Sequence, residues 1–240
     1  MASVALLKNC AKGHLSDFVD PVGPWKSPAR NGPRSFHTYD RQGDASKFDP
    51  LDALAPSMLD ARLGPMEINQ MFSANDTDNP FNNLRVTIER CLTQLASLAA
   101  QSQGTLDFAD VDFSSIDGPW SYVNACYIAS EKTNQIGYSK VSKMLHRKQP
   151  TFIPIIDSKL ANFYGMNSQR FYGSETRSRR ELEKYHSLFQ TDFRTNRNFL
   201  NELSSEVLTS EGNPVSSLRV ADIVIWEHIA TGCSGTTKAK

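Results

Sequence analysis

The chain has 240 residues, 26 acidic and 26 basic side chains, and a hydrophobic fraction of 39%. This composition is typical of a globular protein that fills one large core or two small ones, and no apolar run approaches the roughly 20 residues that a membrane helix needs. We expect no membrane partner and a cytoplasmic location, because Lys8 and Lys12 follow the N-terminal apolar patch, whereas a secretory signal carries its charges before it.

Four prolines and little periodicity in residues 1–36 predict an irregular N-terminal arm. Beyond it, apolar residues at helical spacing and capping residues predict mostly helix. Pro56 predicts a break in the first helix, and Asp222, within the nearly apolar last one, predicts a buried partner for its carboxylate. The expected helices span about 49–59, 65–72, 84–102, 120–132, 139–148, 157–164, 179–189, 192–208 and 216–231.

These elements predict a mainly α fold with at most a few short strands. We expect a single helical domain over residues 37–232 and a monomer, and we leave open a division into lobes at 37–117 and 118–232. Residues 233–240 are polar and terminal, which predicts a disordered tail.

The cysteines and the common motifs argue against a metal or a cofactor. Four cysteines lie far apart, with no Cys-x-x-Cys pair and no Cys/His cluster, so their spacing does not make a zinc site. The chain also contains no GxxxxGK[ST], GxGxxG or HExxH sequence. We therefore expect no metal, no nucleotide and no other cofactor.

Charge is divided along the chain. Residues 40–117 carry 13 acidic and 5 basic side chains, and residues 132–197 carry 13 basic and 5 acidic ones. A basic segment of this kind is typical of proteins that bind a phosphate backbone. The alternative is that the acidic and basic segments pair with each other in the fold, and the sequence leaves both open.

The stretch 135–164 carries the strongest functional signal. A glycine turn opens a basic amphipathic helix, Pro150 ends it, and an apolar extended run leads to Asp157 at the start of another helix, which Gly165 ends. A carboxylate in this place accepts the first N–H groups of the helix as an N-cap. Caps are common and catalytic acids are rare, but the two roles can coexist because a capping carboxylate is held in one orientation.

This stretch resembles the core of the helix-hairpin-helix DNA glycosylase superfamily. The resemblance rests on Gly137-Tyr138-Ser139-Lys140-Val141 and on the run from Pro150 through Ile156 to Asp157, and it covers about 25 residues. The hairpin is degenerate, because the usual L-P-G-x-G is reduced to Asn134-Gln135-Ile136-Gly137. The wider chain, with TYD and FDPLDALAPSML early and SLRVADIVIW late, resembles an uncharacterised bacterial family.

The resemblance implies a glycosylase-like helical fold and assigns roles to residues. Asp157 takes the place of the catalytic aspartate, 18 residues after Ser139, which stands where bifunctional members keep their lyase lysine. Lys140, one position beyond, is the second catalytic candidate, and the strict spacing implies a monofunctional enzyme. The implied DNA-binding residues are Gly137, Ser139, Lys143, His146, Arg147, Lys148 and Arg170, and the candidate base-pocket residues are His37, Tyr39, Asp40, Arg41, Tyr164 and Tyr172.

Each of these groups has a structural alternative. Basic residues on one helix often form a solvated face, and aromatic residues beside them are more often core than base-stacking platforms. A glycosylase must flip its base out of the duplex, stabilise a sugar cation and activate water, and one carboxylate can serve the last two steps.

We therefore predict a monofunctional DNA glycosylase that acts on a damaged or modified base. A modified base of phage DNA, and hence a role in antiviral defence, is one fitting substrate. Two alternatives stay open. One is a non-catalytic helical DNA-binding module that uses Asp157 only as a cap, and the other is an interaction protein whose acidic and basic halves meet.

Overall fold

The computed structural model describes residues 3–8, 11–13, 15, 39, 43–59, 61, 63–73, 78–102, 104–167, 175–208 and 214–231. Within these ranges the chain forms helices and no strand; Leu208 and Pro214 form an isolated antiparallel bridge. The mainly α prediction is confirmed. In the same ranges, no helix combines the length and the apolar character needed to cross a membrane.

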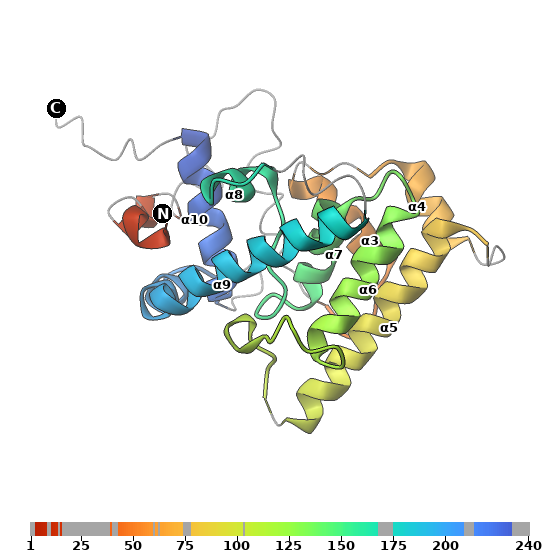
Figure 1. The fold of residues 1–240 in the computed structure, drawn as a ribbon, viewed down its shortest axis with the longest axis horizontal. Coiled ribbons are helices and arrows are strands. Elements are labelled where there is room, and N and C mark those ends of the chain that lie inside the picture. Colours follow the sequence, from red (N-terminus) through yellow and green to blue (C-terminus); the bar gives the residue numbers. More distant parts are fainter. Residues whose placement is uncertain are drawn as a thin grey trace.

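Figure 1 shows the order and arrangement of the helices. The α-helices are α3 (Pro50–Leu54), α4 (Pro65–Phe72), α5 (Pro80–Gln101), α6 (Pro119–Glu131), α7 (Tyr138–Lys148), α8 (Ser158–Phe163), α9 (Glu175–Ser205) and α10 (Ser217–Thr231). The described residues also form the 3-10 helices η1 (Val4–Leu7), η2 (Ala55–Leu59) and η3 (Phe108–Asp110).

Local signals set several of these boundaries. The carboxylate of Asp49 accepts the N–H groups of Leu51 and Asp52, and the Asp52 carboxylate accepts the N–H of Asp49, which completes a capping box at the start of α3. The break predicted at Pro56 is confirmed, because the chain tightens there from α3 into η2.

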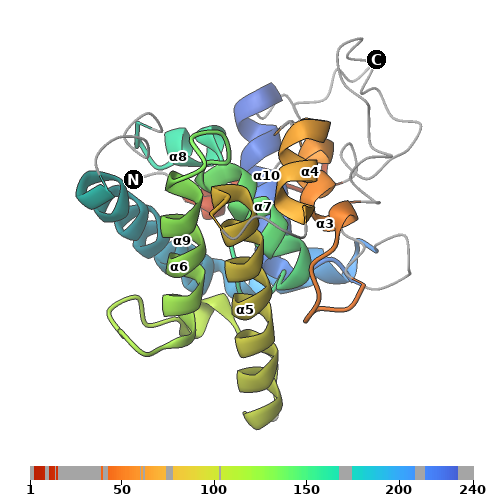
Figure 2. The same cartoon turned by 90° about the vertical axis from the view of Figure 1, so that its right-hand side faces the viewer.

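Helices α5 and α6 run antiparallel and side by side, as both views show (Figures 1 and 2). Their buried stripes, which include Leu84, Ile88, Leu92 and Val123, face each other and the core. The C-terminal end of α5 projects beyond the rest of the molecule (Figure 2). The remaining helices therefore gather around the other part of this pair.

Helix α9 is one continuous helix, so the prediction of two helices at 179–189 and 192–208 is wrong. The sequence analysis placed the start of the second helix at Asp192. Its carboxylate instead accepts hydrogen bonds from the Val4 N–H (2.8 Å), the Tyr164 hydroxyl (2.9 Å) and the Asn196 side chain (2.8 Å). Because these partners come from three parts of the chain, Asp192 ties segments together and does not end a helix.

The N-terminal segment also differs from the prediction. Val4, Leu7, Ala11 and Leu15 are buried in the main core, so the described residues 3–8, 11–13 and 15 do not form an irregular arm. Their spacing of three and four residues is a helical signal that the proline count in 1–36 obscured. The segment 16–36, like the tail 233–240, lies outside the described residues.

Helix α10 is buried along most of its length, with Leu218, Val220, Ile223 and Val224 nearly inaccessible. The partner predicted for Asp222 exists: the Arg219 guanidinium, one turn earlier and equally buried, donates to its carboxylate. Arg219 and Asp222 thus enter the apolar helix as a neutral pair.

Candidate functional site

Helices α6 and α7 are joined by a compact turn, residues 132–137, which gives a helix–turn–helix backbone where the resemblance placed a hairpin. Asn134 occupies the left-handed region, at φ 55°, which asparagine tolerates better than most residues. The Thr133 hydroxyl donates to the Ser130 carbonyl (2.8 Å) and accepts the Ile136 N–H (2.9 Å). Asn134 and Thr133 therefore shape the turn without the glycine and proline of the usual hairpin.

An extended segment carries the chain from α7 to Asp157. Phe152, Ile153, Ile155 and Ile156 are buried, and the Ile156 N–H donates to the Ser142 hydroxyl on α7 (2.9 Å). Asp157 then caps α8, its Oδ1 accepting the Lys159 N–H at 2.9 Å. The predicted N-cap is confirmed, and the Ser142 contact fixes where it lies relative to α7.

The other carboxylate oxygen of Asp157 meets a lysine of α7. Lys143 Nζ lies 3.1 Å from Asp157 Oδ2 and also donates to the Leu59 carbonyl (3.0 Å). The Lys143 side chain is only 4% exposed, and that of Asp157 is 15% exposed. Asp157 is therefore the more accessible member of a largely buried ion pair.

Two further cations of α7 share one buried carboxylate. Arg147 Nε lies 3.0 Å from Asp52 Oδ1, and Lys148 Nζ lies 2.8 Å from Asp52 Oδ2. Arg147 also donates to the Tyr39 carbonyl, and Lys148 donates to the Asp44 carbonyl. The carboxylate comes from the acidic segment and both cations from the basic one, so pairing of the two segments within the fold is confirmed at this contact.

The prediction that the basic side of α7 faces solvent and is free to bind DNA is therefore wrong. Lys143, His146, Arg147 and Lys148 are all buried, because α3 and η2 cover the face that the sequence left for DNA. As positioned, these side chains do not reach a phosphate backbone. Within α7, the more accessible DNA-binding candidates are Ser139 and Lys140, which lie beside Gly137 at its start.

The sequence analysis made Lys140 a catalytic candidate and Lys143 a DNA-binding candidate, but Lys143 is the lysine that contacts Asp157. The ammonium of Lys140 donates to the Gln135 carbonyl (2.9 Å) in the turn, whereas Lys143, one helical turn later, contacts Asp157. Because residues three apart lie on one face of a helix, spacing along α7 could have added Lys143 to Lys140 as a candidate partner of Asp157, but it could not have chosen between them.

Of the base-pocket candidates, the described ones make contacts within the protein. Tyr39 is buried; its hydroxyl donates to the Lys143 carbonyl (2.7 Å), and its ring stacks on His146. Tyr164 is partly buried and donates to Asp192. Both serve internal contacts here. His37, Asp40, Arg41, Arg170 and Tyr172 lie outside the described residues.

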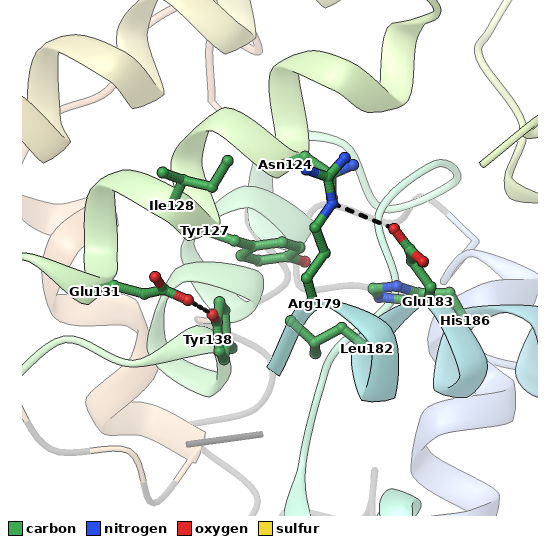
Figure 3. A pocket seen from close by; sticks show the side chains of 9 residues that line it. All are labelled: Asn124, Tyr127, Ile128, Glu131, Tyr138, Arg179, Leu182, Glu183 and His186. Carbon is green, nitrogen blue, oxygen red and sulfur yellow. Dashed lines mark hydrogen bonds and ion pairs between the residues drawn. The ribbon is translucent and has the colours of Figure 1, made fainter. Parts of the chain in front are cut away.

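The sequence did not suggest a pocket that opens between α6 and α9 (Figure 3). Its open space is about 360 Å³, part of which is solvent at the mouth. The residues that line it are Asn124, Tyr127, Ile128, Glu131, Tyr138, Arg179, Leu182, Glu183 and His186. They come from helices far apart in the sequence, so no local pattern could have predicted it.

Two histidines, His146 and His186, are fully buried and neutral. Burial lowers the pKa of His186 to about 3. Burial, and secondarily the nearby Arg219 guanidinium, lowers the pKa of His146 to about 3. His146 Nδ1 lies 2.5 Å from the Ile153 carbonyl, which requires the proton on that nitrogen.

The model of a family of unknown function, DUF6308, matches residues 11–229, which is most of the chain. The chain belongs to this family. The match contains the α6–α7 turn, Asp157, the Asp52 contact and the α6–α9 pocket, so these features lie within one family unit. No curated protein and no solved structure matches the chain.

We expect Asp52→Asn to lower the free energy of unfolding by about 3–5 kcal/mol, because it leaves the buried Arg147 and Lys148 without their counter-charge. Urea denaturation followed by circular dichroism measures this. The control is Glu206→Gln, which breaks the exposed pair with Lys12 and should change the value by less than about 1 kcal/mol. Equal effects of the two substitutions would contradict a buried ionic contact.

Stability should fall as pH is lowered from 6.5 to 5. In this window the unfolded chain protonates its histidines, whereas folded His146 and His186 stay neutral, so the unfolded state binds more protons. Each histidine should contribute about 1.4 kcal/mol per pH unit well below its unfolded pKa. Urea titrations across the window measure the slope, and His186→Phe should remove about half of it. A flat profile would mean that the folded imidazoles take up protons.

Proposed function

We propose that this chain is a monofunctional DNA glycosylase with Asp157 as its catalytic carboxylate. The observation that carries the proposal is the presentation of Asp157. A helix–turn–helix and a buried extended segment place this carboxylate, which is 15% exposed, at the N-terminus of α8. One oxygen accepts the Lys159 N–H and the other lies beside Lys143. Hydrolysis of an N-glycosidic bond needs an oriented carboxylate next to the sugar.

In this proposal the chain acts without a cofactor. The Asp157 carboxylate stabilises the positive charge that develops on the sugar and activates the attacking water. Lys143 holds that carboxylate in position, and the flipped base must enter from the exposed side of Asp157. A base modified in phage DNA is one substrate that such an enzyme could remove.

The start of α7 is the DNA contact that the described residues best support. Gly137 provides no side-chain cap, so the first N–H groups of α7 are available to a phosphate, and Lys140 lies next to them. This contact replaces the one expected from Lys143, Arg147 and Lys148.

The second candidate is a non-catalytic helical DNA-binding module. Both oxygens of Asp157 are already bonded, to the Lys159 N–H and to Lys143, which is what a purely structural cap requires. This module and the enzyme share the α7 contact with DNA and differ only in turnover.

Asp157→Asn should lower the rate of base release by about 10²–10⁴-fold, because the amide neither stabilises the sugar cation nor accepts a proton from water. Chromatography of free bases released from DNA with varied modifications, followed by alkaline cutting of abasic sites, measures it. Asparagine leaves Lys143 unpaired, so Asp157→Asn combined with Lys143→Met, which restores neutrality, is the matched control for folding. If the wild-type chain binds DNA and releases no base from any substrate, the module stands and Asp157 is a cap.

Lys140→Gln should weaken DNA binding for all sequences and reduce the slope of log K against log salt concentration by about 0.9, the loss of one phosphate contact. Fluorescence anisotropy at several salt concentrations measures the slope. The matched control is Lys12→Gln, since Lys12 pairs with Glu206 at a distant, exposed site. An affinity that does not depend on salt would favour the interaction protein over both DNA-binding candidates.

A further inference from the structure

The extended segment that leads from α7 to Asp157 is buried, and no strand pairs with it in the described part of the chain. Ile155 and Ile156 are only 2% and 1% exposed. Backbone N–H and C=O groups buried in this way need partners, which a neighbouring strand would supply in a sheet. Here side chains supply them. The Tyr185 hydroxyl donates to the Ile155 carbonyl (2.9 Å), and the Ser142 hydroxyl accepts the Ile156 N–H (2.9 Å).

These two hydrogen bonds hold the two ends of one peptide group. The Ile155 carbonyl and the Ile156 N–H belong to the same planar unit, which is trans like the other peptide bonds of the described residues. In a trans peptide the C=O and the N–H point in opposite directions. Tyr185 on α9 therefore holds the unit from one side and Ser142 on α7 holds it from the other. The peptide plane cannot turn unless one of the two bonds breaks.

The clamped peptide lies directly before the candidate catalytic residue. Ile156 is the one residue between this peptide plane and Asp157, and its side chain is buried in the main core. The direction in which the chain enters α8 is therefore set by α7 and α9 together. Lys143 and the Lys159 N–H then fix the two carboxylate oxygens of Asp157.

Tyr185 is itself held firmly. It is 0% exposed, and its ring packs against those of Tyr164 and Phe189, with centroids 6.2 Å and 5.9 Å away. Burial, and secondarily the charge of Asp157, raises the pKa of Tyr185 well above its usual value. The hydroxyl therefore keeps its proton and remains a hydrogen-bond donor.

We propose that Tyr185, together with Ser142, is a positioning residue for Asp157. By holding the peptide between Ile155 and Ile156, it sets the place from which the carboxylate meets the sugar. This inference rests on the proposed function and adds α9 to the residues on which base release depends. Catalytic groups must be held within about 0.5 Å of their productive geometry, and a misplacement of about 1 Å can cost about 100-fold in rate.

Tyr185→Phe tests this role, because it keeps the ring and removes only the hydroxyl. We expect kcat for base release to fall about 10–100-fold. The dissociation constant for DNA should stay the same, since the proposed DNA contact at the start of α7 is untouched. Single-turnover assays and fluorescence anisotropy measure the two quantities. Ser142→Ala removes the bond at the other end of the same peptide, so it should show the same pattern.

Ser204→Ala is the matched control. The Ser204 hydroxyl lies further along α9 and donates to the Val215 carbonyl, so this variant also loses one bond from α9 to a backbone carbonyl. Both substitutions should lower the melting temperature by about 2–4 °C. Only Tyr185→Phe should lower kcat, because the segment that Ser204 holds does not lead to Asp157.

A second measurement does not require activity. The Lys159 N–H donates to Asp157 Oδ1, so the rate of its hydrogen exchange reports how firmly the carboxylate is held. Exchange followed in ¹⁵N spectra should be about tenfold faster at Lys159 in Tyr185→Phe than in the wild-type chain. In Ser204→Ala it should be unchanged.

The outcomes separate this inference from the proposed function. A lower kcat with unchanged DNA affinity and faster exchange at Lys159, in Tyr185→Phe and not in Ser204→Ala, supports it. It is overturned if Lys159 exchanges at the wild-type rate in Tyr185→Phe, if kcat of an active chain does not change, or if Ser204→Ala lowers kcat equally. If the wild-type chain releases no base, the proposed function fails, and exchange at Lys159 alone decides whether Tyr185 holds Asp157.

Discussion

The buried carboxylate of Asp52 is the contact on which the arrangement of this protein depends. It receives Arg147 and Lys148 from the last turn of α7, and all three side chains lie almost entirely out of solvent. Two cations in such a place are tolerable only with a counter-charge and further hydrogen bonds, which the Tyr39 and Asp44 carbonyls supply. The contact therefore fixes the acidic N-terminal segment across the basic helix.

Helix α7 connects this contact to the candidate active site. One end of the helix carries the Asp52 pair, its middle carries Lys143 and Ser142, and its start borders the turn after α6. Lys143 reaches Asp157 and Ser142 accepts the Ile156 N–H, so the position of Asp157 follows from that of α7. Because buried charges hold α7 in place, Asp157 is held on a rigid support, which the catalytic role that we propose for it would require.

The α6–α9 pocket has the opposite character. Its deep groups are neutral, and its charged groups Arg179 and Glu183 are paired with each other. The Tyr127 hydroxyl and His186 Nε2 are buried without a hydrogen-bond partner. The Asp157 region supplies charge and the pocket supplies flat, neutral surface. The Asp157 region and the pocket thus differ in chemistry and use separate residues, and both lie on helices that pack on one core.

Much of the local structure was predictable. Capping residues, prolines and apolar spacing placed α3 through α8 within a few residues, predicted the break at Pro56, and identified Asp157 as an N-cap. The continuity of α9 was missed, because the contacts of Asp192 with Val4 and Tyr164 join residues that are distant in sequence. The helical spacing of the N-terminal segment was missed because of the prolines in residues 1–36.

The sequence by itself determined the helices α3 through α8 and the identity of the carboxylate that caps α8, since both depend on neighbours within about four residues. Tertiary structure decided which face of α7 meets solvent, which lysine pairs with Asp157, and whether Tyr127 and His186 share a pocket. The physical reason is that an amphipathic basic face has the same pattern whether it meets water, a phosphate backbone or a buried carboxylate. The packing of α3 and η2 on α7 decides that the basic face of α7 meets a buried carboxylate. The packing of α6 opposite α9 brings Tyr127 and His186 together.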